Sequence, residues 1–414
     1  MTRLALGIDI GSSGVRAIAI EADGKVVAEA KAALPKPDRT DGMIRTAAPD
    51  WWQAVETCLA AMPRDRIGAI AVDGTSGTLL LCGQDGTPLG AARRYDDAGS
   101  AAHAGQIRAL APAESAAHGA SSPAARLLDL QKQHPDAALA LHQADWVVGR
   151  LTGRFGVSDD NNALKSGWDP VARTWPAWLD GFGIERRLLP EVLEPGTVVG
   201  EARRELGFAK GAVVVAGTTD GCASFLATGA DQPGDGVTAL GTTLTLKLLS
   251  DRPVFDPGAG VYSHRLLGMW LAGGASNTGG AALLRFFTAE RMRELEAGLE
   301  PAKPTGLDYW PLAARGERFP VADAAMESRH EPRPPEDGRF FQGLLEGIAK
   351  VERQAYGRLS KLGAPALRSV RTVGGGAANA AWTAIRAQML GVPMLEPASE
   401  QAAYGTALLA RRAL

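Results

Sequence analysis

Short apolar runs that end in glycine, serine, threonine or aspartate recur along the chain. They cover residues 4–10, 15–20, 67–72, 213–216, 237–240, 244–248, 261–272 and 370–373. Their apolar and β-branched residues predict strands, and the small polar residues behind each run predict a turn or loop. Because functional side chains concentrate on loops held by a rigid scaffold, these strand ends are the first places to look for chemistry.

A second spacing, with apolar residues every three or four positions, predicts helices. They are expected at 49–62, 139–151, 340–362 and 380–391, with a final helix that begins at Ser399. Asp50 and Ser399 are residue types preferred at helix N-caps. Gly405 interrupts the last helix at a cost of about 1 kcal/mol relative to alanine, which indicates close helix packing or the approach of a ligand or loop. Residues 317–338, rich in proline and charge, are expected to form an irregular connection.

The strand–turn–strand pattern near the N-terminus has a counterpart in the middle of the chain. Gly11-Ser12-Ser13-Gly14 joins the first two strands, and Gly241-Thr242-Thr243 joins the runs at 237–240 and 244–248. We interpret the repetition as an internal duplication, with two lobes that each begin with a hydroxyl-rich hairpin.

Composition excludes several classes of protein. The 414 residues are 45% hydrophobic and 22% charged, and the formal net charge is -2. A near-neutral chain lacks the basic excess of a nucleic-acid binder, and no apolar stretch is long enough to span a membrane. Cys58, Cys82 and Cys222 show no metal-binding spacing and are expected to be buried thiols. Asp9 falls where a secretory signal would be apolar, so a cytoplasmic protein is expected.

Two of the strand-end segments carry an acid beside glycine and hydroxyl residues. Asp9 precedes the first hairpin turn, and Asp220 lies in the segment Gly217-Thr218-Thr219-Asp220-Gly221. Backbone N–H groups in such turns bind anions, a nearby carboxylate can hold Mg²⁺ through water, and a carboxylate beside a hydroxyl can take its proton. Together these groups suit phosphoryl transfer to an alcohol.

Other motifs are absent or are explained by structure. The sequence has no GxxxxGK[ST] loop, no GxGxxG after the first strand and no HExxH pair, and Ser76 is not in a GxSxG elbow. Three nearby tryptophans are expected to pack in the core or under loops: Trp168, Trp175 and Trp178. Two arginine pairs are expected to be solvated surface charge: Arg93-Arg94 and Arg203-Arg204.

The order of these loops resembles that of the FGGY carbohydrate kinases over nearly the whole chain. The opening phosphate hairpin of that family is similar to LGIDIGSSGVRAIAI, and its mid-domain helix and loop to HQADWVVGRLTGRFGVSDDNNAL. Its catalytic-aspartate segment is similar to AGTTDGCASFLATGA, its second phosphate hairpin to GTTLTLK and its adenosine loop to GGGAANAAW. The resemblance implies an α/β, two-lobe ribonuclease H-like ATPase fold with a central cleft, shared with actin, the heat-shock chaperone ATPases and hexokinase.

The resemblance also implies roles for individual positions. Asp220 matches the general base, Asp9 the acid beside the substrate, the phosphates and Mg²⁺, and Asp73 and Ser76 sugar-side positions. ATP contacts are implied at Gly11, Ser12, Ser13, Gly241, Thr242, Gly374, Gly375, Gly376 and Asn379, with Ser276 and Asn277 on the adenine side.

Within the family, three segments resemble the short D-ribulose kinases of cyanobacteria and plants, some of them labelled xylulokinase-like. These segments are AVDGTSGTLLLCGQDGTPL, VYSHRLLGMWLAGGASNTGGA and GLDYWPLAARGERFP. That group phosphorylates D-ribulose with MgATP to give D-ribulose 5-phosphate. The chain departs from the family where a signature lysine and tryptophan are usual, because it has Arg126 and Asp129 in SPAARLLDLQKQ.

We therefore expect a sugar-binding lobe over residues 1–228, joined by the last helix at 401–414, and an ATP-binding lobe over 229–400. The expected partners are a sugar and ATP, with no nucleic acid and no membrane, in a monomer or small homo-oligomer. Three alternatives stay open: a kinase for D-xylulose, L-ribulose or ribitol, an ATP-binding sensor or ATPase without a sugar substrate, and an actin-like filament protein.

Overall fold

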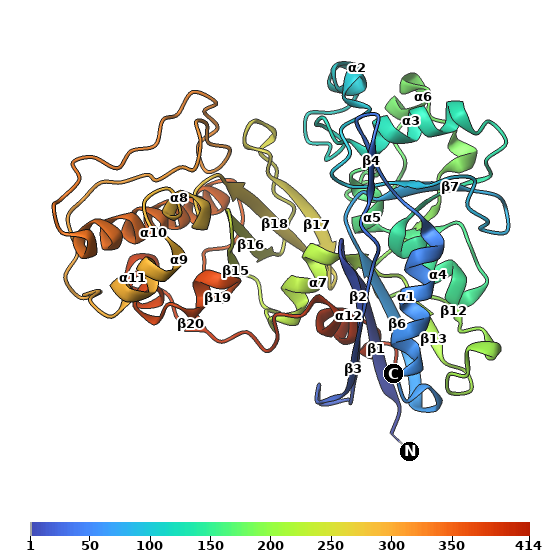
Figure 1. Cartoon of the computed structure of the whole chain (residues 1–414). Helices are drawn as coiled ribbons and strands as arrows, with labels where there is room; N and C mark the ends of the chain where they lie inside the picture. The colour runs from blue at the N-terminus through green and yellow to red at the C-terminus, as the bar shows by residue number, and fades with distance from the viewer. Residues whose placement is uncertain (1) are drawn as a thin grey trace. The chain divides into compact units, whose positions relative to one another are not determined.

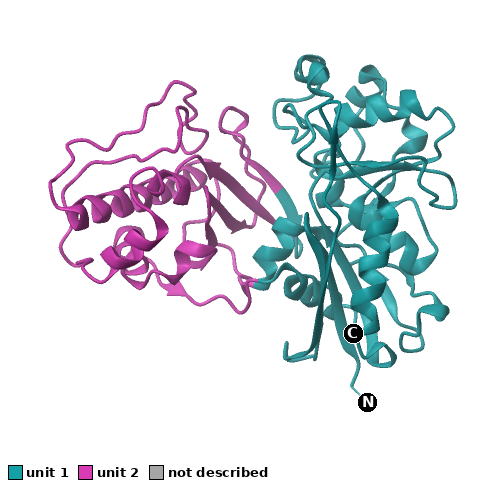
Figure 2. Ribbon diagram, in the orientation of Figure 1, with its two compact units in different colours: residues 1–227, 264–268, 401–414 teal, residues 228–263, 269–400 magenta. Residues whose placement is uncertain are grey.

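The computed structural model describes residues 2–414 and divides the chain into two compact units (Figure 2). Unit 1 contains the chain up to Ala227, the segment His264–Gly268 and the C-terminal segment Gln401–Leu414. Unit 2 contains Thr228–Ser263 and Met269–Glu400. The short segment His264–Gly268 groups with unit 1, although the sequence placed all of 229–400 in one lobe.

Unit 1 carries most of the strands. They are β1 (Leu4–Ile10), β2 (Gly14–Ile20), β3 (Val26–Ala33), β4 (Asp38–Thr40), β5 (Met43–Thr46), β6 (Ile67–Gly74), β7 (Leu79–Cys82), β8 (Ala92–Arg93), β9 (Leu139–His142), β10 (Val157–Asp159), β11 (Glu191–Leu193), β12 (Val198–Glu201), β13 (Val213–Val215) and β14 (Thr218–Thr219). Its helices are α1 (Ala48–Ala60), α2 (Ala104–Leu110), α3 (Pro123–Gln133), α4 (Gln143–Thr152), α5 (Asp160–Leu164), α6 (Trp178–Phe182), α7 (Asp220–Ala227) and α12 (Ala402–Arg411).

The main sheet of unit 1 has the strand order β12-β13-β6-β1-β2-β3, and β14 also pairs with β6. Strands β1 and β6 are parallel, whereas β1–β2 and β2–β3 are antiparallel hairpins. A second sheet has the order β4-β5-β8-β7-β9, and β10 pairs with β11. The β1–β6 register sets Asp9 directly opposite Asp73.

Alternation along β1 sends its side chains to two faces of the sheet. Leu6 and Ile8 join a core with Trp51 of α1 and Trp146 of α4. On the other face α12 packs closely, because a Cβ added to Gly7 would lie 2.1 Å from the carbonyl oxygen of Ala403 (Figure 1). Asp9 shares the face of Gly7, so its carboxylate lies on the side of the sheet that α12 covers.

Unit 2 is built around one sheet and one long helix. Its sheet has the order β17-β18-β16-β15-β19-β20, with β15 (Asp235–Leu240), β16 (Leu244–Ser250), β17 (Tyr262–Leu266), β18 (Met269–Ser276), β19 (Ser369–Val373) and β20 (Met394–Leu395). The residues of β17 from His264 onward group with unit 1. Its helices are α8 (Gly280–Leu283), α9 (Ala289–Glu296), α10 (Asp337–Lys361) and α11 (Ala380–Leu390). The 3-10 turns of the two units are Arg64–Arg66, Ala101–His103, Arg186–Leu188, Arg204–Leu206, Pro257–Ala259 and Gly375–Ala378.

The predicted duplication is confirmed in the sheet topology. In unit 1 the order β6-β1-β2-β3 consists of one parallel pair followed by two antiparallel pairs. In unit 2 the order β19-β15-β16-β18 repeats the same pattern of directions. Each unit therefore presents one hydroxyl-rich hairpin turn at the end of its first two strands.

Several sequence predictions need correction at element boundaries. Residues 139–142 are strand β9, and the helix expected from 139 begins only at Gln143. The run 261–272 is two strands that are joined by a turn with positive φ at Leu267 and Gly268. Helix α1 begins before Asp50, which lies in its first turn, and α12 is capped by Gln401 rather than Ser399. The irregular connection at 317–338 is confirmed up to the start of α10.

The burial of individual side chains confirms some of the sequence predictions and contradicts another. The three cysteines are buried free thiols, and Trp168 stacks edge to face on Trp175, as expected. The prediction that Arg93 and Arg94 are solvated is wrong, because they are only 3% and 8% exposed.

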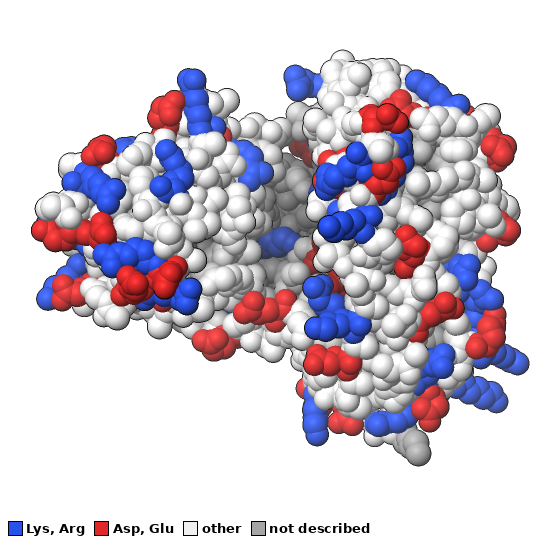
Figure 3. Space-filling view, viewed as in Figure 1, with Lys and Arg blue, Asp and Glu red and all other residues white. Residues whose placement is uncertain are grey.

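The charged side chains on one face of the molecule are drawn in Figure 3. On the face drawn in Figure 3, basic and acidic side chains are interspersed over both units rather than gathered into a patch of one sign. Among residues 2–414, no helix combines the length and the apolar character that a membrane span needs.

Candidate active site

Two carboxylates lie side by side on the sheet of unit 1. Asp9 on β1 and Asp73 on β6 occupy paired positions of adjacent parallel strands and are 4% and 0% exposed. Arg16, on the neighbouring strand β2, places Nη1 3.1 Å from Oδ2 of Asp9. A buried pair of acids with one cation cannot be fully ionised without cost.

The surroundings of Asp9 and Asp73 raise the pKa values of the two carboxyl groups to different extents. The pKa of Asp9 is raised by its burial, although the neighbouring Asp73 and the partner Arg16 lower it in part. The pKa of Asp73 is raised well above its usual value, first by complete burial and then by the charge of Asp9. Asp73 is therefore the member of the pair that retains a proton while Asp9 ionises.

A side chain of the last helix forms a hydrogen bond with Asp73. Thr406 of α12 donates its hydroxyl to Oδ2 of Asp73, and Oδ1 of Asp73 has no partner among residues 2–414. The sequence predicted Asp73 as a direct sugar contact, but complete burial leaves it no surface for a sugar to touch. Its position beside Asp9 instead suits a positioning role for that carboxylate.

Asp220 belongs to the same group of charges. It is the first residue of α7 and is half-buried, and its Oδ1 accepts the backbone N–H of Gly221 at 2.7 Å. Its charge contributes to the raised pKa of Asp73. The sequence placed Asp220 in a loop, whereas the structure places it at a helix start, where the helix dipole stabilises negative charge.

The first hairpin turn is the exposed part of this region. Ser12 and Ser13 are exposed, and the turn is closed by the N–H of Gly11, which donates to the carbonyl of Gly14 at 3.0 Å. Arg94 donates from Nη1 to the carbonyl of Ser12 at 3.3 Å. The free hydroxyls and backbone of this turn can approach an anion.

Several polar groups of the loop after Asp73 form hydrogen bonds within the protein. The N–H and hydroxyl of Thr75 both donate to Oε1 of Gln143, and the carbonyl of Gly77 accepts from Nη2 of Arg126 at 2.8 Å. The predicted sugar-side residue Ser76 lies in this loop, and its Oγ is buried without a partner among residues 2–414. The hydroxyl of Ser76 is therefore not used by the protein within the described chain.

Unit 2 contains a pocket of about 480 Å³ beside its own hairpin turn. Its lining includes five residues for which nucleotide contacts are expected from the sequence: Gly241, Thr242, Gly375, Gly376 and Asn379. Its apolar wall and rim come from residues that the sequence did not single out: Leu240, Leu283, Leu284, Met292, Arg293, Phe341, Leu345 and Trp382. The volume lies in the range of pockets that bind small molecules and cofactors.

The glycine loop that borders this pocket needs glycine for geometric reasons. Gly374 has φ +87°, and a Cβ there would lie 3.0 Å from the carbonyl oxygen of Leu240. A Cβ on Gly376 would lie 2.7 Å from the Cβ of Leu240 and 2.8 Å from the ring of Trp382. At Gly375 a Cβ would meet no protein atom within 4 Å, so the backbone is open to a ligand there.

Three predicted nucleotide residues of unit 2 do not line the pocket, and the three in the first hairpin turn belong to unit 1. Gly374 shapes the loop without reaching the lining. Ser276 donates from Oγ to Glu317 at 2.6 Å, and the N–H of Asn277 donates to the same carboxylate at 2.7 Å. Ser276 and Asn277 thus join β18 to the connection after α9 through hydrogen bonds. From the sequence they were expected on the adenine side.

The residues present fit ATP and Mg²⁺. The open backbone at Gly375, the hairpin turn at Gly241 and the apolar wall suit phosphates and an aromatic base. Among residues 2–414, no three His, Cys, Asp or Glu side chains gather into a group that could hold a metal ion. Mg²⁺ beside phosphates needs only one or two carboxylates because water and phosphate supply its other ligands, so the lack of such a group does not conflict with binding of MgATP.

Sequence reasoning missed two residues that complete the acid pair, Arg16 and Thr406. A usable signal existed for each. Arg16 lies two residues after the hairpin turn, at the strand position paired with Asp9. Thr406 is a polar residue beside Gly405 on the otherwise apolar face of the last helix.

Comparison with known proteins agrees with this arrangement. The chain matches the N-terminal domain of the FGGY family of carbohydrate kinases over residues 4–227 and its C-terminal domain over 236–414. An autoinducer-2 kinase of Yersinia enterocolitica is 26% identical over 98% of this chain and 85% of its own length.

Solved structures show the fold. A xylulose kinase from Rhodospirillum rubrum, 24% identical, matches with a TM-score of 0.85 over 99% of this chain and 89% of that chain. A glycerol kinase from Plasmodium falciparum, solved with ADP, is 15% identical and matches with a TM-score of 0.84 over 99% and 89%. The fold is the two-lobe ribonuclease H-like ATPase fold expected from the sequence. Since both family domains are matched in order along its length, the chain belongs to the FGGY family of carbohydrate kinases and is an ATP-dependent sugar kinase.

Proposed function

We propose that this enzyme phosphorylates the primary O5 hydroxyl of a ketopentose, with D-ribulose as the substrate and D-ribulose 5-phosphate as the product. The observation that carries the chemistry is the group of three acids in unit 1, where Asp73 retains its proton and the buried Asp9 is paired with Arg16. Asp220, at the start of α7, supplies the general base.

In the proposed reaction, Asp220 accepts the proton of the O5 hydroxyl as that oxygen attacks the γ-phosphorus. The new bond joins O5 to phosphorus, the bond between phosphorus and the β–γ bridging oxygen breaks, and ADP leaves. Bound MgATP supplies the phosphoryl group and a cation that offsets its charge. Asp9 would hold that cation, and the turns at Ser12 and Thr242 would donate to phosphate oxygens.

The choice of D-ribulose rests on sequence, because segments of the chain resemble the short D-ribulose kinases. D-xylulose, L-ribulose and ribitol stay in the panel as alternatives, because sugar choice depends on a few hydrogen bonds. The similarity to autoinducer-2 kinases adds autoinducer-2 to that panel.

The test is sugar-dependent ADP release by the purified full chain with MgATP. We expect the highest kcat/KM with D-ribulose, and Asp220→Asn should lower kcat by about 10²-fold or more because the base is lost. The exposed Asp65, in a 3-10 turn of unit 1, provides a matched control as Asp65→Asn.

Each outcome decides a separate point. A preference for another sugar would retain the reaction and replace the substrate. Near-normal turnover by folded Asp220→Asn would remove the base assignment. ADP release that is indifferent to every sugar would favour the ATPase or sensor alternative.

A further inference from the structure

Unit 1 contains a small cavity that is built from residues outside the candidate active site. Its volume is about 90 Å³, and its walls come from β5, β7, β8 and α3 and from the two residues before β8. At roughly 30 Å³ for each water molecule, the cavity has room for about three waters. That volume suits a compact ion or one end of a larger ligand, whereas whole small-molecule ligands occupy pockets of about 300 Å³ or more.

The polar side chains that line this cavity favour an anion. Arg45 and Arg93 contribute guanidinium groups, His134 an imidazole and Gln133 an amide. The other described residues of the lining are apolar residues or glycine, so no carboxylate lies in the cavity wall. Guanidinium groups are always charged and only donate, and they therefore require a ligand that accepts hydrogen bonds.

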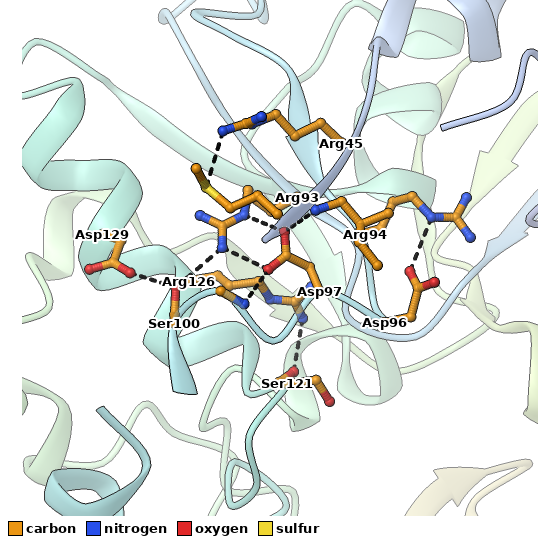
Figure 4. A network of polar contacts seen from close by, with 12 residues as sticks. Arg45, Arg93, Arg94, Asp96, Asp97, Ser100, Ser121, Arg126 and Asp129 are labelled. Atoms are coloured by element: carbon orange, nitrogen blue, oxygen red, sulfur yellow. Dashed lines mark hydrogen bonds and ion pairs between the residues drawn. The ribbon is translucent and has the colours of Figure 1, made fainter. Parts of the chain in front are cut away.

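The two arginines of the cavity face each other across a pair of strands. Arg45 of β5 and Arg93 of β8 occupy directly opposite positions of an antiparallel ladder, and Figure 4 draws the two side chains next to each other. Side chains at such positions lie on the same face of the sheet, and like charges placed there repel each other. An anion between the two guanidinium groups would relieve this repulsion.

Arg93 is neutralised within the protein, yet one of its nitrogens is not used. Oδ2 and Oδ1 of Asp97 accept Nε and Nη2 of Arg93 at 2.6 and 2.7 Å, and Ser100 lies 3.4 Å from Nη2 (Figure 4). Nη1 forms no hydrogen bond among residues 2–414 and is not completely enclosed. Arg93 can therefore offer the two N–H bonds of Nη1 to a ligand in the cavity.

The charge of Arg45 is less well neutralised than that of Arg93. Its carboxylate partner among the described residues is Asp38, whose Oδ2 lies 3.6 Å from Nη1 and whose side chain is 53% exposed. The other acceptors are the hydroxyl of Thr40 at 3.1 Å and the sulfur of Met43 at 3.2 Å, which is a weak acceptor. Because water screens so exposed an ion pair, Arg45 retains attraction for a second anion.

His134, the C-cap residue of α3, adds a third donor to the cavity. Its ring forms no hydrogen bond or ion pair within residues 2–414. Its Nε2 lies beside Gly90, where a Cβ would be only 3.3 Å away. Glycine at this position therefore leaves space next to the imidazole, and an imidazole N–H can donate to an oxyanion.

We propose that this cavity binds a phosphate group, with Nη1 of Arg93, the guanidinium of Arg45 and the ring of His134 as donors. A phosphate group accepts several hydrogen bonds at once, and the fork of an arginine matches the spacing of its oxygens. The group belongs either to inorganic phosphate or to a phosphate monoester whose organic part extends out of the cavity. The inference goes beyond the proposed function and does not depend on the identity of the sugar.

The test is calorimetric titration of the purified full chain with inorganic phosphate at constant ionic strength. We expect Arg45→Met to raise the Kd at least about 10-fold, because charge-assisted hydrogen bonds to the phosphate are lost. Arg39→Met is the matched control, since it removes the same charge from the neighbouring strand β4 and Arg39 does not line the cavity. The Kd of this control should stay within about 2-fold of the wild-type value.

A parallel titration with D-ribose 5-phosphate distinguishes the two sources of the group. Tighter binding of the ester than of inorganic phosphate, lost in Arg45→Met, would identify a monoester, and the reverse order would identify the free ion. Phosphate held in the nucleotide pocket of unit 2 would still bind to Arg45→Met, so equal Kd values for this variant and the wild type overturn the inference. A wild type that binds neither probe overturns it as well. Should Arg45→Met fail to fold, His134→Leu carries the same comparison.

Discussion

Thr406, in the last helix, donates its hydroxyl to the carboxyl of Asp73, a residue of the first sheet. The contact joins two parts of the chain that are 333 residues apart. It lies on the face of the sheet that α12 covers, where the backbone of α12 approaches β1 closely because Gly7 lacks a Cβ. The C-terminal helix therefore belongs to the support of the acid pair.

Removing this hydroxyl should destabilise the fold. Thr406→Val retains the shape but leaves both oxygens of the buried Asp73 carboxyl without a protein donor, so the free energy of unfolding should fall by about 1–3 kcal/mol. Urea unfolding measures the loss, and Thr406→Ser, which retains the hydroxyl, should lose much less. Equal stability of the valine and serine variants would show that the contact contributes nothing.

The raised pKa of Asp73 predicts a pH dependence of stability. Above the unfolded value of 3.8, and until the higher folded pKa is reached, the native state holds a proton that the unfolded chain releases. Stability contributed by this group is therefore lost as the pH rises through that window. Asparagine does not titrate, so Asp73→Asn should flatten this fall while retaining an oxygen that accepts from Thr406.

The measurement is the free energy of unfolding at a series of pH values from about 4 to 8, for the wild type and Asp73→Asn. Asp65→Asn, an exposed control in the same unit, should retain the wild-type slope. A slope for Asp73→Asn equal to that of the wild type would mean that Asp73 titrates near its usual pKa.

The hairpins and strands could be predicted from sequence because their signals are local. Gly11–Gly14 and Gly241–Thr243 each stand between two apolar runs, and both became turns between antiparallel strands. The pairing of Asp9 with Asp73 could not be predicted in the same way, since it depends on the register of β1 against β6. A hint was present, because each acid stands next to last in its strand or apolar run.

Long-range contacts explain the predictions that were wrong. Arg93 looks like surface charge in sequence, but it is neutralised by Asp97 four residues later and buried against α3. Residues 139–142 have a helical spacing, yet they pair with β7 and become a strand. In both places a tertiary partner overrides a local preference.

Gly405 provides a test of close packing. A Cβ at this position would lie 1.9 Å from the carbonyl oxygen of Ala223 and 2.7 Å from the N of Ala227, both backbone atoms of α7. Gly405→Ala should therefore lower the free energy of unfolding by about 3 kcal/mol, despite the higher helix propensity of alanine.

Gly105 of α2 is the matched control in the same unit, because a Cβ there would meet no atom within 4 Å. Gly105→Ala should raise stability by about 0.4–1 kcal/mol through the unfolded state. Both values come from thermal unfolding of the purified variants. A neutral or stabilising Gly405→Ala would mean that α12 and α7 can separate at little cost.

Alanine substitutions at two adjacent glycines of unit 2 separate the effect of protein packing from that of a ligand approaching the backbone. Gly376→Ala would place a Cβ against Leu240 and Trp382, so it should lower stability by about 1–3 kcal/mol with or without nucleotide. Gly375→Ala meets no protein atom within 4 Å and should leave the stability of the free enzyme within about 0.5 kcal/mol of the wild type.

If nucleotide phosphates approach the backbone at Gly375, the added methyl should raise the KM for ATP about 10-fold or more and leave the KM for the sugar unchanged. Steady-state kinetics with each substrate varied in turn measures both values. Gly357→Ala, on an open stretch of α10 in the same unit, should change neither KM. An unaltered KM for ATP in Gly375→Ala would mean that the nucleotide does not touch this loop, and the pocket beside Gly241 and Gly376 would then need another ligand.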